Sequence, residues 1–84
     1  MNEKVILITG CSSGIGFDAA LALKQRGHKV IASCRKKEDE QKLMALGVEA
    51  VLLDVSSSSS IHLAFAEVLS KTEGRLDVLI NNAG

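Results

Sequence analysis

The chain has 84 residues, which is enough for one small domain and excludes a separate substrate-binding domain. Hydrophobic residues make up 46% of the chain and charged residues 24%, a balance typical of a folded globular protein and not of a disordered one. Ten basic and ten acidic residues give a net charge of zero, so no overall field attracts nucleic acid or an anionic membrane.

From the apolar runs and the first residues we expect neither a membrane anchor nor a signal peptide. Apolar runs such as Val5–Ile8 are too short to span a bilayer, and residues 1–4 lack the apolar region of a signal peptide. We therefore expect a cytoplasmic protein. Cys11 and Cys34 then stay reduced, and their spacing is not that of a metal site. Both are expected to be small packed residues; a thiol of lowered pKa at a helix start is the alternative for Cys11.

The first third of the chain predicts a strand and a helix. The unbroken apolar run Val5–Ile8 is typical of a strand buried on both faces. After a turn rich in glycine and serine, apolar residues recur at i, i+4, i+7 and i+8, which predicts a helix that ends before Gly27. Its expected buried stripe is Ile15, Ala19, Ala22 and Leu23.

The middle of the chain repeats this alternation. Residues 29–34 predict a second strand, and residues 38–46 a second helix whose acidic first turn, residues 38–40, complements the helix dipole. Gly47 ends that helix. Residues 48–53 predict a third strand, which is followed directly by Asp54.

The last part of the chain predicts a third helix and a fourth strand. The serine run 56–60 precedes apolar residues at helical spacing, so we interpret it as a helix start and not as a flexible linker. The expected stripe is Ile61, Phe65, Val68 and Leu69. Residues 76–80 predict the fourth strand, followed by the sequence Asn81-Asn82-Ala83-Gly84.

The order of these elements predicts the fold class. Strands and helices alternate, and each connection is long enough for a crossover helix, which implies parallel strands. The chain is therefore expected to be α/β, a partial Rossmann-type doubly wound parallel sheet of four strands and three helices. Such sheets bind ligands beyond the carboxyl ends of their strands, and the unusual residues of this sequence follow strands.

The turn between the first strand and first helix predicts an anion site. It contains Gly10, Gly14 and Gly16, which permit a tight reversal and a close approach of the backbone to a ligand. The helix that follows offers unpaired N–H groups and the positive end of its dipole to a pyrophosphate. A strand before the turn and a helix after it is the context expected of a dinucleotide site.

The same turn permits a second interpretation. Gly10-x-Ser12-x-Gly14 has the spacing of the turn that carries the nucleophile of serine hydrolases. That chemistry needs a histidine base, and neither His28 nor His62 is placed for it by the pattern. A serine hydrolase fragment using Ser12 therefore stays the alternative, together with a non-catalytic nucleotide-binding module.

Three motifs together carry a family resemblance. Thr9-Gly10-x-x-x-Gly14-x-Gly16, Asp54-Val55 after the third strand and Asn81-Asn82-Ala83-Gly84 after the fourth resemble the opening part of the short-chain dehydrogenase/reductase family. The resemblance implies NAD or NADP binding. It assigns Asn81 to bracing the sheet, Asp54 to the adenine amine with Val55 beside it, and Asn82, Ala83 and Gly84 to the riboses and nicotinamide side. The residues implied at the pyrophosphate are Gly10, Ser12, Ser13, Ile15 and Gly16.

Simpler roles remain open for Asp54, for the nearby Ser56 and for the sequence Asn81-Asn82-Ala83-Gly84, which is alternatively a generic turn. Asp54 is alternatively a strand-end turn residue, and Ser56 the N-cap of the third helix.

The second strand is followed by Arg35 and two lysines. A basic residue here accommodates the 2′-phosphate of NADP, whereas NAD is held by an acidic one. Arg35 therefore favours NADP, with a solvated basic turn as its alternative.

The catalytic group of the family has no counterpart in this sequence. The family uses a Tyr-x-x-x-Lys pair, and the chain contains no Tyr, so we assign no catalytic residue. We expect residues 1–84 to be the N-terminal part of a single NAD(P)-binding Rossmann domain whose catalytic half is absent. The expected function is NADP-dependent oxidation or reduction of a carbonyl or alcohol substrate, in a parent protein that is a homo-oligomer.

Overall fold

A computed structural model describes residues 3–11, 14–54 and 56–82. Strands and helices alternate along the chain, as the sequence predicts. The elements are β1 (Val5–Ile8), α1 (Gly14–Gln25), β2 (Lys29–Cys34), α2 (Lys37–Ala45), β3 (Glu49–Leu52), α3 (Ser58–Lys71) and β4 (Val78–Ile80).

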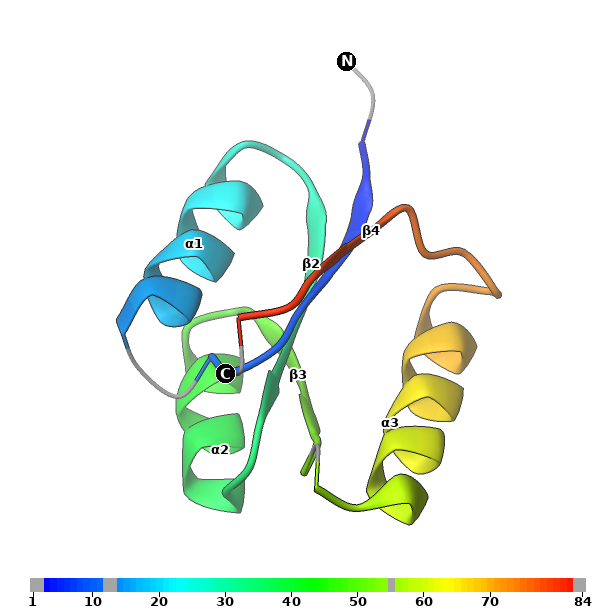
Figure 1. Ribbon diagram of the computed structural model, residues 1–84. Helices are drawn as coiled ribbons and strands as arrows, with labels where there is room; N and C mark the ends of the chain where they lie inside the picture. Colours follow the sequence, from blue (N-terminus) through cyan, green and yellow to red (C-terminus); the bar gives the residue numbers. More distant parts are fainter. Residues whose placement is uncertain (1–2, 12–13, 55, 83–84) are drawn as a thin grey trace.

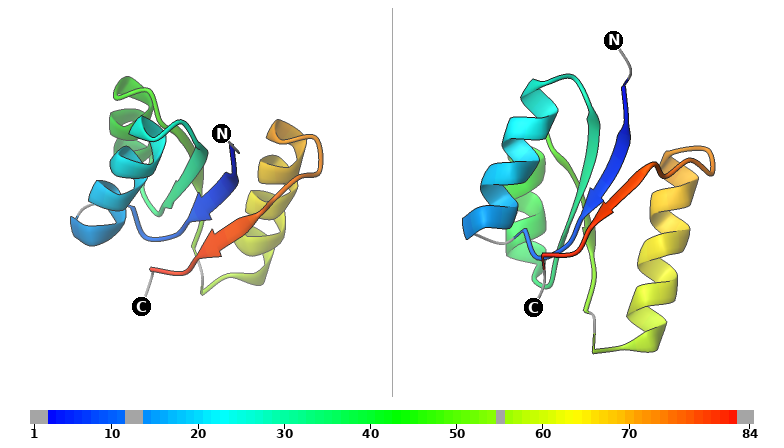
Figure 2. Two further views of the ribbon diagram at one scale, coloured as in Figure 1. Left: turned by 90° about the horizontal axis from the view of Figure 1, so that it is seen from above. Right: turned by 45° about the horizontal axis from the view of Figure 1, so that its top comes forward.

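The four strands of the described part form one parallel sheet in the order β3-β2-β1-β4. The first strand of the chain therefore lies in the interior of the sheet, between the second and the last (Figure 1). Helices α1 and α2 cover one face and α3 covers the other, so the molecule has three layers (Figures 1 and 2). This is the expected α/β architecture with a partial doubly wound sheet.

Each face of the sheet has its own apolar core. Alternate residues of a strand point to opposite faces, and β1 accordingly sends Ile6 and Ile8 toward α1 and α2 but Leu7 toward α3. On the first face they meet Ala20 and Leu43. Burial on both sides explains why β1 consists only of large apolar residues.

Strand β4 is the exposed edge of this sheet. It pairs with β1 on one side only. Its residues Val78, Leu79 and Ile80 are 37%, 51% and 36% exposed, although the register places them beside fully buried residues of β1. The apolar sequence of β4 is thus typical of an interior strand, but its surroundings are those of an edge.

The structure corrects several local expectations, among them Leu69, which was expected on the buried stripe of α3 but is 40% exposed. The buried residues of α1 are Gly16 and Ala20, whereas Ile15 is 81% exposed and Ala22 is also exposed. The N-cap of α3 is Ser57, whose side chain accepts a hydrogen bond from the Ser60 N–H, and not Ser56. Strand β4 begins at Val78, two residues later than predicted, because the preceding residues form the turn into it.

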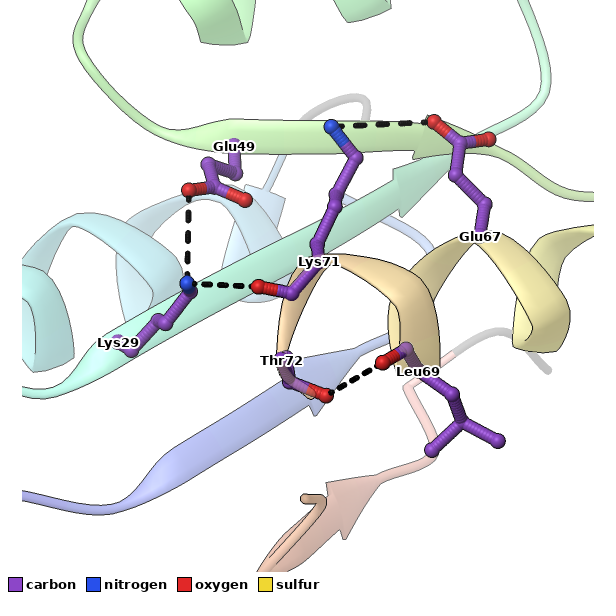
Figure 3. Close-up of polar contacts among 6 residues, drawn as sticks. All are labelled: Lys29, Glu49, Glu67, Leu69, Lys71 and Thr72. Carbon is purple, nitrogen blue, oxygen red and sulfur yellow. Dashed lines mark hydrogen bonds and ion pairs between the residues drawn. The ribbon is translucent and has the colours of Figure 1, made fainter. Parts of the chain in front are cut away.

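A polar network ties the amino end of the sheet to α3 (Figure 3). Lys29 Nζ donates to the carbonyl of Lys71, the last residue of α3, at 3.0 Å and lies 3.9 Å from a carboxylate oxygen of Glu49. Lys71 Nζ lies 3.9 Å from Glu67 one turn earlier. Lys29 therefore neutralises the negative end of the α3 dipole.

Within the described ranges, no helix is long and apolar enough to cross a membrane.

Candidate nucleotide-binding edge

The turn after β1 is anchored to both neighbouring strands. The Thr9 N–H donates to the Ile80 carbonyl of β4 at 3.0 Å, and the Cys11 N–H donates to the Ser33 carbonyl of β2 at 2.8 Å. Between them Gly10 has a φ of 69°, a conformation that glycine adopts without the steric cost of a side chain. The turn therefore leaves the carboxyl edge of the sheet in a fixed direction.

Two asparagines hold the turn from the other side. The Thr9 hydroxyl donates to Asn81 Oδ1 at 3.1 Å and accepts from the Asn82 N–H at 3.0 Å. Asn82 Nδ2 donates to the Gly10 carbonyl at 3.1 Å. Asn81 thus lies where a residue bracing the sheet is expected, and Asn82 braces the turn as well.

Gly16 is where α1 packs directly on this turn. A Cβ built on Gly16 would lie 2.5 Å from Asn82 Nδ2 and 2.6 Å from the Gly10 carbonyl oxygen, distances that no side chain tolerates. Gly14 has a φ of 68° and open space around its Cα. One glycine is therefore required by packing and the other by backbone conformation, and together they bring the first N–H groups of α1 to the edge.

Asp54 lies at the same edge, after β3. Its Oδ1 accepts from the Ser56 hydroxyl at 2.6 Å and from the Ser56 N–H at 3.0 Å. These bonds hold the pKa of Asp54 below its ordinary value, with a smaller contribution from the charge of Arg35. Asp54 is therefore an ionised acceptor that forms a strand-end turn, as its simpler interpretation expects, and it remains available to a ligand.

Arg35 is exposed directly after β2, within electrostatic range of Asp54. The N-cap residue of α2, Lys36, makes no side-chain capping bond. The α2 N–H groups therefore lack a side-chain acceptor at the cap, next to a cationic side chain. Glu38, Asp39 and Glu40 in the first turn of α2 already complement the positive end of its dipole, so Arg35 is the group on this side that suits an anion.

The two thiols lie beneath this edge and stay protonated at neutral pH. Cys11 and Cys34 are buried and free. Burial is the main cause that raises the pKa of each thiol to about 11. The expectation of small packed residues is confirmed, and the alternative of a lowered pKa for Cys11 is wrong.

Among the described residues, neither histidine is placed to act as the general base that the serine hydrolase alternative requires. His28 lies at the amino end of β2, where its Nδ1 accepts from the Lys4 N–H at 3.1 Å. His62 lies on the exposed side of α3.

Five predicted site residues lie outside the described residues and stay predictions: Ser12, Ser13, Val55, Ala83 and Gly84.

The sequence analysis missed the role of Thr9. This side chain joins the turn to both asparagines, and it is only 6% exposed. The available signal was a hydroxyl residue directly after a buried apolar strand, where an unsatisfied polar group would be costly. Ser60 was likewise missed: its hydroxyl accepts from the Asp54 N–H at 2.9 Å.

Comparisons with known proteins identify the class to which this fold and edge belong. Residues 4–84 match the short chain dehydrogenase family, and the chain belongs to that family. It is 45% identical over 82 residues to the uncharacterized oxidoreductase YbbO of Escherichia coli K12, covering 98% of this chain and 30% of YbbO. It is 45% identical over 84 residues to the NADPH-dependent 1-acyldihydroxyacetone phosphate reductase of Schizosaccharomyces pombe, covering 98% of this chain and 28% of the reductase.

Solved structures agree with the fold. A short-chain dehydrogenase from Streptomyces avermitilis superposes with a TM-score of 0.87 at 42% identity, over 99% of this chain and 31% of that one. A ketoreductase structure with NADPH, from actinorhodin polyketide synthesis, gives a TM-score of 0.81 at 38% identity, over 98% and 33%. A Brucella melitensis reductase complexed with NADH gives 0.82 at 33% identity, over 90% and 32%. The chain thus spans about a third of the length of these relatives.

The residues of the carboxyl edge fit the nicotinamide dinucleotide that the family implies. The start of α1, with Gly14 and Gly16 in its first turn, offers N–H donors to a pyrophosphate. Arg35 offers a cation to a further phosphate, and the Asp54 carboxylate offers an acceptor to the adenine amine. Each group has the charge or donor type opposite to its expected partner.

Proposed function

We propose that the chain is the cofactor-binding part of an NADP-dependent short-chain oxidoreductase that acts on a carbonyl or alcohol substrate. The observation that carries this proposal is the convergence at one sheet edge of the glycine turn, the start of α1 and the Arg35 side chain. The NADPH-dependent relative and the neighbour with NADPH support it, while the neighbour with NADH makes the choice of cofactor a matter for experiment.

Arg35 carries the preference for NADP. A hydrogen bond from a guanidinium to a phosphate is worth about 1.5–3 kcal/mol, which corresponds to roughly tenfold to one-hundredfold in affinity. NAD lacks the 2′-phosphate and leaves the guanidinium without this partner. The local cations are therefore expected to select the phosphorylated cofactor.

The chain's own residues bind and orient, and they do not transfer a proton. When bound, NADPH supplies the hydride. A carbonyl that receives it also needs a proton donor, and general acid catalysis contributes about 10²–10⁴ in rate. The chain contains no Tyr, so the residues that complete the reaction belong to the part of the relatives that this chain does not match.

The cofactor preference is tested in a chimera in which residues 1–84 replace the matching segment of the S. pombe reductase. Arg35→Asp should lower kcat/KM for NADPH roughly tenfold to one-hundredfold and raise that for NADH. Arg26→Asp, the same charge change on an exposed residue at the opposite end of the sheet, is the matched control. Equal use of both cofactors before and after Arg35→Asp would remove Arg35 from the site.

The proposal that this chain binds the cofactor but does not catalyse the reaction is tested with the 84-residue chain alone. We expect it to show no NADPH oxidation with a panel of ketones and aldehydes, while the chimera oxidises NADPH with its own substrate. Substrate-dependent oxidation by the chain alone, absent in Gly14→Asp, would overturn the proposal of a binding part. An inactive but folded chimera would favour a non-catalytic nucleotide-binding module.

A further inference from the structure

We infer that Cys11 and Cys34 form a dithiol that hydrogen peroxide closes to a reversible disulfide, and that closure weakens nucleotide binding at the carboxyl edge. The disulfide follows from the fold alone, whereas its effect on binding rests on the proposed function. Both thiols are buried nucleophiles to which that function gives no role.

The backbone places the two cysteines opposite each other on neighbouring strands. The hydrogen bonds of a parallel ladder slant, so a residue that donates to one carbonyl lies opposite the next residue of the partner strand. The Cys11 N–H donates to the Ser33 carbonyl at 2.8 Å. Cys11 therefore lies opposite Cys34, the last residue of β2.

Gly10 turns both thiols to the same face of the sheet. Continuing the register of β1 with β2 would place Cys11 opposite Arg35 and on the face away from Ile8, because alternate residues face opposite sides. Gly10, with a φ of 69°, is an extra residue of the bulge type and returns Cys11 to the face of Ile8. Both thiols accordingly belong to the apolar core on the side of α1 and α2.

The spacing of the pair permits a disulfide at the cost of a small movement. Neighbouring strands lie about 4.7–4.9 Å apart, which is inside the Cα separation of about 4.4–6.8 Å found in disulfides. The Cβ atoms of a disulfide are about 3.5–4.5 Å apart. Closure therefore draws Cys11 and Cys34 together by roughly 0.5–1 Å.

Cys11 is the thiol expected to react first. Burial raises its pKa, but the Ser33 N–H lies within hydrogen-bonding range of its sulfur and acts in the opposite direction. The pKa of Cys34 is raised by burial and further by neighbouring negative charge, including that of Cys11. Each thiol therefore senses the ionisation of its surroundings differently, and Cys11 has the better stabilised thiolate.

The reaction oxidises two sulfur atoms and reduces one peroxide. The Cys11 thiolate attacks a peroxide oxygen, which breaks the O–O bond, forms a sulfenic acid and releases hydroxide. The Cys34 thiolate then attacks the Cys11 sulfur, which forms the S–S bond and releases a second hydroxide. The two hydroxides and the two thiol protons give two water molecules.

Closure moves the turn on which the nucleotide site depends. Cys11 follows Gly10, whose carbonyl accepts from Asn82 Nδ2 at 3.1 Å and lies against Gly16. Drawing Cys11 toward β2 carries Gly10 away from Asn82, because Asn82 follows β4 on the other side of β1. The start of α1 then loses its fixed position, and its N–H groups no longer converge on a pyrophosphate.

The test for the disulfide is peptide mapping of the folded 84-residue chain after treatment with hydrogen peroxide at pH 8. Free thiols are blocked in urea before digestion with trypsin, which leaves Cys11 in residues 5–24 and Cys34 in residues 30–35. We expect these two peptides to be linked and to separate in dithiothreitol. Closure should be slow, because the pKa of each thiol is raised to about 11, and the far-UV circular dichroism should be unchanged.

The test for coupling is a calorimetric titration with NADPH before and after oxidation. The oxidised chain should bind at least about tenfold more weakly than the reduced chain, and dithiothreitol should restore the affinity. Cys34→Ala is the matched control: it keeps Cys11 but cannot close, so peroxide should leave its Kd unchanged. If the chain alone does not fold, the chimera yields the same two peptides, and the KM for NADPH replaces the Kd.

The outcomes separate the inference from the proposed function. Unlinked peptides from a folded chain, or linkage with loss of the circular dichroism of the fold, would overturn the inference. So would a linked chain that binds NADPH as tightly as the reduced one, or an equal loss of affinity in Cys34→Ala, which would assign the effect to oxidation of Cys11 alone. A reduced and folded chain that binds no NADPH would overturn the proposed function, and the linked peptides would still decide the disulfide.

Discussion

Gly16 shows how one missing side chain lets a helix contact a turn. Gly16→Ala would gain about 1 kcal/mol of helix propensity, yet the new methyl would collide with the Gly10 carbonyl and the Asn82 amide. Overpacking of this kind costs about 1–3 kcal/mol. We expect a net loss of stability, seen as a lower midpoint of urea unfolding, together with weaker nucleotide binding.

Gly14→Ala is the matched comparison for this prediction. Gly14 has a positive φ, but a methyl group added there would have no neighbour within 4 Å, so only backbone strain of about 1 kcal/mol is expected. A Gly16→Ala protein as stable as the parent would show that α1 can move away from the turn.

Burial of the two thiols limits the stability of the fold at alkaline pH. The pKa of Cys11 and of Cys34 is raised to about 11 from 9.0, so the stabilisation they contribute is complete below pH 9 and is lost as the pH rises toward 11. Cys11→Ala should lower stability at pH 7 and flatten this alkaline decline, as measured by urea unfolding at several pH values. Rapid alkylation of the native protein at pH 8 would contradict the burial of both thiols.

At this scale, the residue types of the site could be predicted but their contacts could not. The glycine spacing and Asp54 are local patterns, visible along the sequence. The role of Thr9 depends on β4, which reaches the turn from more than 70 residues away, and a sequence pattern does not encode that approach. The contact of Asn82 with Gly10 likewise arises only in the folded sheet, so the sequence did not predict it.

At the scale of elements, Lys29 connects the sheet to the end of α3 (Figure 3). Lys29→Met keeps the aliphatic stem but removes the bond to the Lys71 carbonyl and the contact with Glu49. The expected loss is about 0.5–1 kcal/mol, measured by chemical unfolding and reduced at high salt. Lys71→Met removes the pair with Glu67 one turn away but leaves the Lys29 bond to the Lys71 carbonyl, and it should cost less, about 0.3–0.5 kcal/mol. Equal losses would argue against a special role for the helix end.

Element types and order were predictable, whereas boundaries and faces were less so. The strands β1 and β2 match their predicted bounds, and in β1 the reason is an unbroken apolar run. The stripe of α1 was displaced by one residue because the pattern gives weight to Ile15 and Ala22, whereas close packing at the turn selects Gly16 for burial. Hydrophobic periodicity identifies large side chains and misses a helix that packs through a glycine.

At the scale of the whole molecule, the free edge of β4 is expected to promote association. It combines unpaired backbone groups with exposed apolar side chains, a template for pairing with another strand. Sedimentation of the 84-residue chain should depend on concentration, and unfolding should not be a sharp concentration-independent transition. Leu79→Lys should reduce association because a charged residue blunts an edge strand.

Leu63→Lys is the control for this prediction. Leu63 is 72% exposed and belongs to α3, not to the β4 edge strand. If both lysine variants reduce association equally, general surface hydrophobicity and not the strand edge is responsible.

The placement of β1 between β2 and β4 also has a consequence for synthesis on the ribosome. The glycine turn emerges early, yet Thr9 meets its partner Asn82 only after 73 further residues. A nascent chain stalled before β4 would carry every glycine of the turn held only by the bond from Cys11 to β2, and we expect it to bind no nucleotide. Affinity should appear abruptly once Asn82 has cleared the exit tunnel, so the first part of the site to be translated is the last to become functional.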